Sequence, residues 1–308
     1  MNGGTMVKLT MKRFLATLLA LSIASVAFAD ERDTYLELLG KGKYEALEAH
    51  LRQWTGKEPE NPELCIAWFN YYLQRNSKSG AAIGMDIDRS KPHMVITDPE
   101  TGEVVGYLGE RTLYDHEDVE AAIGWLEKGI ALAPDRLDMH FGLIHLLADI
   151  GSVERQVEAM VRAIDTGARI GSRWLWSLDE KIPDAETIFL ESMQDYYRGL
   201  YERGTDETLG ALRDVSLRQI EAFPRSPHAY NLLSLYYQEV GDYEGSVGIL
   251  LRALELDRRD WVIVGNLALA YENLGELEKA RECLDLIIAD GPEEYAEWAT
   301  YQKEQIEE

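Results

Sequence analysis

Apolar residues recur at helical spacing through most of the chain, and near the C-terminus one pattern occurs twice. Its first copy consists of Leu233, Tyr237, Gly241, Tyr243 and Leu250, and 34 residues later the same positions hold Leu267, Tyr271, Gly275, Leu277 and Leu284. A period of this length built of helical segments predicts stacked helix–turn–helix units, which bury their apolar faces against their neighbours.

Glycine and proline mark the limits of these C-terminal helices. We expect helices over 227–240, 243–256, 261–274 and 276–289, followed by a polar helix over 293–307 that caps the stack. Gly241 suits a left-handed helix end, and Pro224 and Pro292 stand where a second helix cannot continue.

The repeat pattern extends upstream with less regular units. The second helix of one unit is indicated by Ala122, Leu126, Gly129 and Pro134. The unit after it is indicated by Leu143, Gly151, Met160 and Ala163. Residues 35–39 and 44–54 predict a first, degenerate pair of helices. Between Asp165 and Pro224 the pattern loses its register. We therefore expect about five repeat-like units, of which the first and the fourth match poorly.

One unit contains an insertion. Its first helix covers 64–74, but the small residue expected near position 80 of its second helix is Ala122, 42 residues late. Runs rich in β-forming residues at 93–97 and 103–108 flank a turn at 98–102 that contains Pro and Gly. This pattern predicts a β-hairpin, which either forms a binding element or covers the apolar side of the early repeats.

The two C-terminal units resemble tetratricopeptide repeats. In the first unit, the motif positions hold Tyr230, Leu233, Ser234, Tyr237, Gly241, Ser246, Leu250 and Ala253, with Arg258 where the family has Pro. In the second, they hold Val264, Leu267, Ala268, Tyr271, Gly275, Ala280, Leu284, Ile287 and Pro292. The resemblance implies an all-α fold, an α-solenoid of tetratricopeptide-like helix pairs, with a small inserted β-hairpin.

These patterns divide the chain into seven segments. They are a signal peptide (1–29), N-terminal degenerate repeats (30–79), an insertion (80–116), tetratricopeptide-like repeats (117–164), an irregular helical segment (165–223), two clear repeats (224–292) and a capping helix (293–308).

The N-terminus has the composition of a secretory signal peptide. Lys8, Lys12 and Arg13 precede an apolar run over 14–28, and Ala27-Phe28-Ala29 forms a cleavage site. We therefore expect export to the periplasm or the extracellular space, with a retained membrane anchor as the alternative. The cleavage site has no Cys, so lipid anchoring is unsupported. The start residue stays open among Met1, Met6 and Met11.

The charge balance narrows the class of partner. The chain has 31 basic and 55 acidic residues, a net charge of −24. This balance disfavours nucleic acid and anionic membrane surfaces and favours a neutral or basic protein or peptide, although the charge also keeps a long solenoid soluble. Cys65 and Cys283 lie in apolar helical contexts and are expected to be buried structural thiols.

The resemblance further implies a concave peptide-binding groove lined by the first helix of each pair. The residues at these positions are His228, Asn231, Leu235, Gln238, Glu239, Val262, Gly265, Leu269, Glu272, Asn273, Asp138, Phe141, His145 and Asp149. None is basic, which disfavours a clamp for a C-terminal carboxylate. Asn231 and Asn273 are candidates to bind the backbone of an extended peptide, and the alternative is that they are only solvated.

Signals for catalysis are weak. The six histidines form no HExxH pair, and neither a Walker loop nor a GxSxG elbow is present. Residues 114–118, Tyr-Asp-His-Glu-Asp, form the densest group of metal-ligating side chains, at a position where a helix is expected to begin. We expect no cofactor and no bound metal. The alternative is a Ca²⁺-binding or small enzymatic site built on the insertion around Asp86, Asp88, Asp98 and His116.

A second candidate interface breaks the acidic trend of the chain. It consists of Arg169, Arg173, Trp174 and Trp176, residue types that are frequent at interface hot spots. Taken together, the sequence predicts an exported, non-catalytic scaffold or adaptor that binds a protein or peptide through the groove, the hairpin or both. Self-association through the ends of the solenoid stays open.

Overall fold

A computed structural model describes residues 29–84, 92–97, 99, 101 and 104–307. The predicted signal segment, apart from Ala29, lies outside the described residues, as do Asp86, Asp88 and Asp98. The chain forms two compact units, of which the first ends at Lys57 and the second begins at Glu58. Each unit is described by itself.

The first unit is a pair of helices, α1 (Ala29–Gly40) and α2 (Tyr44–Lys57), that pack against each other. Leu47, Leu51 and Trp54 form one buried stripe on α2. The chain turns between the helices at Gly42, whose φ of 62° lies in the left-handed region that favours glycine. A helix pair is therefore present where the sequence predicted a degenerate one.

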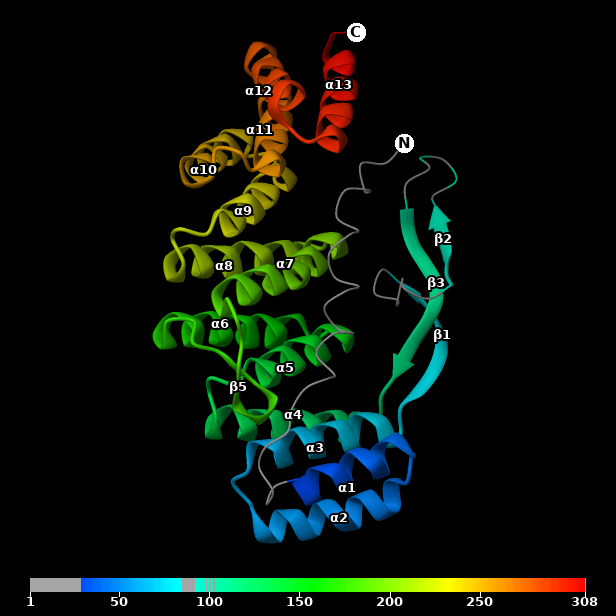
Figure 1. The fold of residues 1–308 in the computed structure, drawn as a ribbon. Coiled ribbons are helices and arrows are strands. Elements are labelled where there is room, and N and C mark those ends of the chain that lie inside the picture. The colour runs from blue at the N-terminus through cyan, green and yellow to red at the C-terminus, as the bar shows by residue number, and fades with distance from the viewer. Residues whose placement is uncertain (1–28, 85–91, 98, 100, 102–103, 308) are drawn as a thin grey trace. The chain divides into compact units, whose positions relative to one another are not determined.

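The second unit consists of helix pairs that follow one another in chain order (Figure 1). The pairs are α3 (Pro62–Arg75) with α4 (His116–Leu132), α5 (Leu137–Asp149) with α6 (Val153–Ile170), α7 (Ala185–Arg203) with α8 (Asp206–Ala222), α9 (Pro227–Glu239) with α10 (Tyr243–Leu256), and α11 (Trp261–Asn273) with α12 (Leu277–Asp290), followed by α13 (Glu293–Glu307). The described part of the chain thus has six pairs rather than about five, and α7 and α8 form a full pair without the motif residues. The solenoid fold is confirmed.

Glycine ends the first helix of four pairs in the second unit. Gly151, Gly204, Gly241 and Gly275 have φ values of 73°, 62°, 76° and 74°. The amide of each donates to a carbonyl in the last turn of the helix, as in the bond of 3.1 Å from Gly241 to Gln238. An L side chain is strained at these angles, so the repeating glycine is required by the turn.

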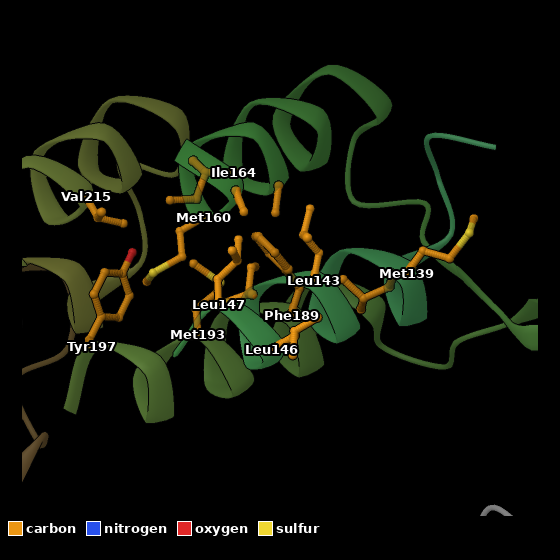
Figure 2. Close-up of a cluster of buried hydrophobic side chains, with 14 of the residues drawn as sticks. Met139, Leu143, Leu146, Leu147, Met160, Ile164, Phe189, Met193, Tyr197 and Val215 are labelled. Carbon is orange, nitrogen blue, oxygen red and sulfur yellow. The ribbon is translucent and has the colours of Figure 1, made fainter. Parts of the chain in front are cut away.

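A core cluster runs from α4 to α9 and so joins four consecutive helix pairs. Figure 2 shows Leu143 and Leu147 of α5, Met160 of α6, and Phe189 and Met193 of α7 directed into one apolar region. All five side chains are at most 2% exposed. Each pair therefore depends on its neighbours for burial, as expected for a solenoid.

Smaller clusters fill the C-terminal pairs, and α13 closes the last of them. Ala299 of α13 is fully buried with Ala268 of α11 and Leu284 of α12. Trp298 lies close to Gly265, where an added Cβ would come within 3.1 Å of its ring. The small residue at 265 is explained by this close approach, and α13 packs on the stack as a cap.

The insertion is a three-stranded antiparallel sheet, in the order β1-β3-β2. Its strands are β1 (Lys78–Gly84), β2 (Met94–Thr97) and β3 (Val104–Leu113). β2 and β3 form the predicted hairpin, and β1 is an additional strand on the other side of β3. The sequence does not indicate β1, because Lys-Ser-Gly-Ala-Ala-Ile-Gly is rich in small residues with low strand propensity.

The segment between α6 and α7 packs on earlier helices. It contains β4 (Leu175–Trp176), a 3₁₀ turn, η2 (Ser177–Asp179), and β5 (Glu180–Lys181). The backbone N–H of Leu178 donates to Glu63 at 2.8 Å, and the Leu175 N–H donates to the Asp135 carbonyl at 2.9 Å. This short hairpin therefore links the start of α3 to the start of α5.

A buried arginine supports the same junction. Arg136, 1% exposed, forms ion pairs of 2.7 Å with Glu63 and 2.8 Å with Asp138. A third, longer contact of 3.4 Å reaches Asp179, whose side chain is 72% exposed. A buried charge is tolerated only when it is paired, and here two carboxylates with little exposure supply the pairing.

Candidate functional site

The first helices of neighbouring pairs contact one another, α5 with α7, α7 with α9, and α9 with α11. The Phe141 ring of α5 stacks on Phe189 at 6.2 Å and lies 5.9 Å from the ring of Tyr196. Tyr201 of α7 donates to Glu239 of α9 at 2.7 Å. The Asn266 amide of α11 donates to Asn231 of α9 at 2.8 Å. Aromatic, amide and carboxylate contacts thus join these helices into one face, called here the first-helix face.

The predicted groove residues lie on three of these helices, α5, α9 and α11. Most of them are half-buried: Asp138, Phe141, Asp149, His228, Asn231, Leu235, Gln238, Leu269 and Glu272. The exposed ones are His145, Glu239, Val262 and Asn273, and Gly265 is buried. Their role in binding stays a prediction.

Several polar groove residues have partners within the protein. Gln238 donates to the Ser246 hydroxyl at 3.2 Å. Asn273 donates to the Leu269 carbonyl of its own helix at 2.8 Å. A peptide that used these amides would have to replace or share those bonds, so their affinity for a peptide backbone is reduced.

A pocket of about 420 Å³ opens where β3 meets the helices. It is lined by Arg111, Thr112, Leu113, Tyr114, His116, Val119, Glu120, Asp149, Ile150, Ser152 and Arg155. These residues come from the end of β3, the start of α4, the end of α5 and the start of α6. The volume is within the range of small-ligand sites.

Asp149 connects this pocket to the first-helix face. Its Oδ2 accepts a hydrogen bond of 3.2 Å from the Tyr114 hydroxyl. The same oxygen lies 3.7 Å from Nε2 of His145, one turn earlier on α5. A carboxylate at the end of a helix is electrostatically unfavourable, because the last turn carries a partial negative charge.

Two arginines stabilise that end of α5. Arg111 of β3 donates to the Asp149 backbone carbonyl at 2.8 Å, and Arg203 of α7 donates to the Ala148 carbonyl at 2.7 Å. Both carbonyls belong to the last turn, where helix carbonyls lack partners inside the helix. Arg111 therefore also fixes the root of the sheet against α5.

An ion pair between Arg155 and Glu120 also lines the pocket. Arg155 of α6 donates to both carboxylate oxygens of Glu120 of α4, at 2.8 and 3.2 Å. Its hydrogen bonds with Glu120 raise the pKa of Arg155, and they lower the pKa of Glu120. Both groups stay charged, and their charges offset each other.

The negative charge of Asp149 acts on two tyrosines. Burial, with the charge of Asp149 next, raises the pKa of Tyr114 to about 12. The same two causes, in the same order, raise the pKa of Tyr196 of α7. Tyr114 thus contacts this carboxylate directly, whereas the Tyr196 hydroxyl donates to the Phe141 carbonyl.

The start of α4 uses the acidic residues of 114–118 structurally. Asp115 caps the helix by accepting from the backbone N–H groups of Glu117 and Asp118. Asp118 pairs with Arg75 and accepts from Asn76 at 2.7 Å. Burial disfavours the charged form of Asp118, but these hydrogen bonds outweigh burial and lower its pKa. Only Tyr114 and His116 of this group line the pocket.

The four residues of the second candidate interface differ in their exposure. Trp174, 2% exposed, packs in the core against His140 and Phe189, with ring distances of 5.3 Å to each. It is therefore not available to a partner. Arg169 and Arg173 are exposed and Trp176 is half-buried, so an interface role for these three stays a prediction.

Among the described residues, no group of three or more His, Cys, Asp or Glu side chains is arranged to hold a metal ion. In the same part of the chain, no helix is both long and apolar enough to cross a bilayer. Cys65 is a buried thiol and Cys283 a half-buried one, and burial raises the pKa of each to about 11. Neither thiol is therefore ionised near neutral pH.

The pocket is not apparent from the sequence pattern. Tyr114 and Asp149 are 35 positions apart, and the sheet that brings them together contains the strand the sequence did not indicate. One signal was present in the sequence, since an aspartate directly before the turn at Gly151 opposes the helix dipole.

Comparison with known proteins agrees with the fold. The tetratricopeptide repeat family model matches residues 237–303. No curated protein sequence matches the chain.

Solved structures are similar at low identity. TTC0263, a thermophilic TPR protein in Thermus thermophilus, is 18% identical, over 62% of this chain and 91% of that one, with a TM-score of 0.37. YrrB, described as a TPR protein with an unusual peptide-binding site, is 12% identical, over 82% and 97%, with a TM-score of 0.38. MamA from Desulfovibrio magneticus RS-1 is 16% identical, over 56% and 85%, with a TM-score of 0.32. The match to the tetratricopeptide repeat model thus covers residues 237–303, which include the turns at Gly241 and Gly275.

Proposed function

We propose that the protein is a non-catalytic scaffold that binds an extended peptide or protein segment along the first-helix face. The observation that carries the proposal is the continuity of this face. Its aromatic, amide and carboxylate side chains join α5, α7, α9 and α11 through direct contacts. A stack of helix pairs held in this way presents a rigid surface for a partner.

The charge on the face favours a neutral or basic segment. None of the predicted groove residues on α5, α9 and α11 is Lys or Arg, whereas Asp138, Asp149, Glu239 and Glu272 are acidic. The net charge of −24 adds a long-range attraction for basic segments. Electrostatic complementarity of this kind contributes to the rate and selectivity of association.

A peptide array tests this function. Residues 30–308 are applied to immobilised 15-residue peptides of random sequence, and selected peptides are measured by fluorescence anisotropy. We expect selection of neutral and basic extended peptides. Glu272→Lys on the first-helix face should weaken binding of a selected basic peptide by about tenfold. Glu255→Lys on the exposed side of α10 makes the same charge change away from this face and should weaken it less than twofold. Equal effects of the two substitutions would contradict the proposal.

We also propose that the scaffold acts outside the cytoplasm. The support is the sequence of residues 1–29, with its basic start, apolar stretch and Ala-Phe-Ala site. N-terminal sequencing of the protein recovered from the periplasmic fraction of a bacterial expression host tests this proposal. A mature chain that begins at Asp30 is expected, and recovery of uncleaved protein in the cytoplasm would oppose it.

The alternative function is a Ca²⁺-dependent or small enzymatic site on the insertion. Of its residues, the structure describes His116, which lines the pocket at the root of the sheet. A rise in melting temperature on adding Ca²⁺ would favour this alternative, because a ligand that binds only the folded state stabilises it. An unchanged melting temperature would leave the peptide scaffold as the better account.

A further inference from the structure

We infer that the pocket at the root of the sheet is a subsite for a basic side chain, with Asp149 as the residue that recognises it. The inference rests on the proposed function, because the pocket adjoins the first-helix face at Asp149. It adds the chemistry of one ligand group, an ammonium or guanidinium, and it gives the insertion a part in binding.

The pocket is lined by two guanidinium groups and two carboxylates. Of the carboxylates, Glu120 is paired with Arg155, so Asp149 is the one left to attract a cation. Arg155 and Glu120 offset each other through their two hydrogen bonds. Arg111 is oriented toward the backbone carbonyl of Asp149. The partners of the carboxylate itself are the neutral Tyr114 hydroxyl and, at 3.7 Å, the His145 ring. At 39% side-chain exposure, the carboxylate is accessible to a ligand and still partly shielded from water.

One tyrosine hydroxyl contacts the same carboxylate, and a second tyrosine is affected by its charge. Tyr114 donates to it directly, and its negative charge raises the pKa of both Tyr114 and Tyr196, after the larger effect of burial. Phe141, two turns before Asp149 on α5, lies beside the ring of Tyr196. The neutral phenol of Tyr114 orients the carboxylate without neutralising it, so the carboxylate keeps its charge for a cationic side chain.

The apolar part of the pocket suits the stem of such a side chain. Leu113, Val119 and Ile150 line the pocket together with the polar residues. Lysine and arginine bury their methylene stems on apolar surface while the charged head finds a polar partner. The pocket therefore offers a carboxylate for the charged head of a basic side chain and apolar surface for its methylene stem.

The first experiment uses small probes, so that it does not depend on any peptide ligand. N-acetyl-lysine methylamide is titrated into ¹⁵N-labelled protein, with the norleucine and glutamate analogues and glycinamide as comparisons. Saturable shifts of the amide signals of residues 113–116 and 149–152 at millimolar concentration are expected for the lysine analogue. Equal shifts with the glutamate or norleucine analogue would overturn the inference. Binding of glycinamide alone would also overturn it, because it would indicate a chain N-terminus as the ligand.

Two variants distinguish direct contact between Asp149 and the lysine analogue from the effect of the pocket's overall charge. Asp149→Asn keeps a side chain of similar shape and should weaken binding of the lysine analogue by more than tenfold. Glu120→Gln removes one negative charge from the same pocket and should weaken it less than threefold. A similar loss in both variants would mean that the pocket acts only through its overall charge, which would overturn the assignment of Asp149.

The inference and the proposed function can fail separately. If the array selects no peptide but the lysine analogue still binds at Asp149, the subsite stands and the proposed function falls. If the array selects peptides without a preference for Lys or Arg, and the lysine analogue does not bind, the subsite falls and the scaffold function stands.

Discussion

At the scale of single residues, the molecule depends on a few buried polar groups that sequence patterns do not reveal. His140 lies in the core, 1% exposed, with its Nε2 3.0 Å from the Pro134 carbonyl and its ring against Trp174. Arg136 is as deeply buried and is paired with two carboxylates. Both side chains stabilise the junction of α4, α5 and the segment between α6 and α7. These contacts help to hold the start of residues 165–223 against the earlier helices, although the repeat pattern is lost there.

His140 makes stability depend on pH. Burial lowers its pKa from 6.5 to about 4, so between these values the unfolded chain binds a proton that the folded chain does not. Its contribution is complete above pH 6.5 and is lost as the pH falls toward 4. Urea unfolding at pH 7.5 and 5.5 should show that His140→Gln reduces the loss of stability by about 1 kcal/mol. An unchanged pH dependence in the variant would show that His140 ionises normally in the folded state.

Arg136 should be the most sensitive charged residue in the core. Arg136→Met leaves the carboxylates of Glu63 and Asp138 without their cation, and the free energy of unfolding should fall by about 3 to 5 kcal/mol. Asp179→Asn removes only the long contact with an exposed carboxylate and should change it by less than about 0.5 kcal/mol. Chemical unfolding followed by circular dichroism measures both, and similar values for the two variants would contradict this account.

At the scale of elements, turns and insertions are placed where they leave the helix pairs intact. Four first helices of the second unit end in a glycine with positive φ. In the pair α3–α4 the sheet replaces that turn, and the ion pair of Arg75 with Asp118 joins the two helices beside it. Lys78 and Leu113, the first and last strand residues, face each other in the β1–β3 register. The chain therefore returns to the point where it left, and α3 and α4 pack as a normal pair.

The turn glycines can be tested against a helical glycine of the same repeat. Gly241→Ala places a Cβ at a φ of 76° and should lower the free energy of unfolding by about 1 to 2 kcal/mol. Gly248→Ala in α10, where an added Cβ meets nothing within 4 Å, should raise it by about 0.5 to 1 kcal/mol. Thermal unfolding measures both changes. Stabilisation by Gly241→Ala would show that the turn does not require the left-handed conformation.

The sheet should be dispensable for folding. None of its residues whose exposure the structure describes is buried, so it adds little to the core. Replacing residues 78–113 with a four-residue Gly-Asn turn should preserve the helical circular dichroism and shift the melting temperature by less than about 5 °C. The same variant should lose binding of the lysine analogue, because Leu113 and part of the pocket wall are removed. Unfolding of the variant would mean that the sheet stabilises the repeats.

At the scale of the whole molecule, the sequence predicts the helices well and the contacts between distant residues poorly. The C-terminal helices begin and end within one residue of the expected positions, because Gly and Pro mark their limits. The burial of Trp174 and the pocket at Asp149 depend on which helices meet, which periodicity along the chain does not specify. The third strand was missed because its small residues carry little strand preference.

Binding of a partner along the first-helix face can be tested by hydrogen–deuterium exchange. The exchange of residues 30–308 is measured with and without a peptide selected from the array. We expect protection concentrated in α5, α7, α9 and α11, with the ends of β3 and α5 included when the peptide contains Lys or Arg. Protection confined to the second helices of the pairs, or to β1 and β2, would contradict it.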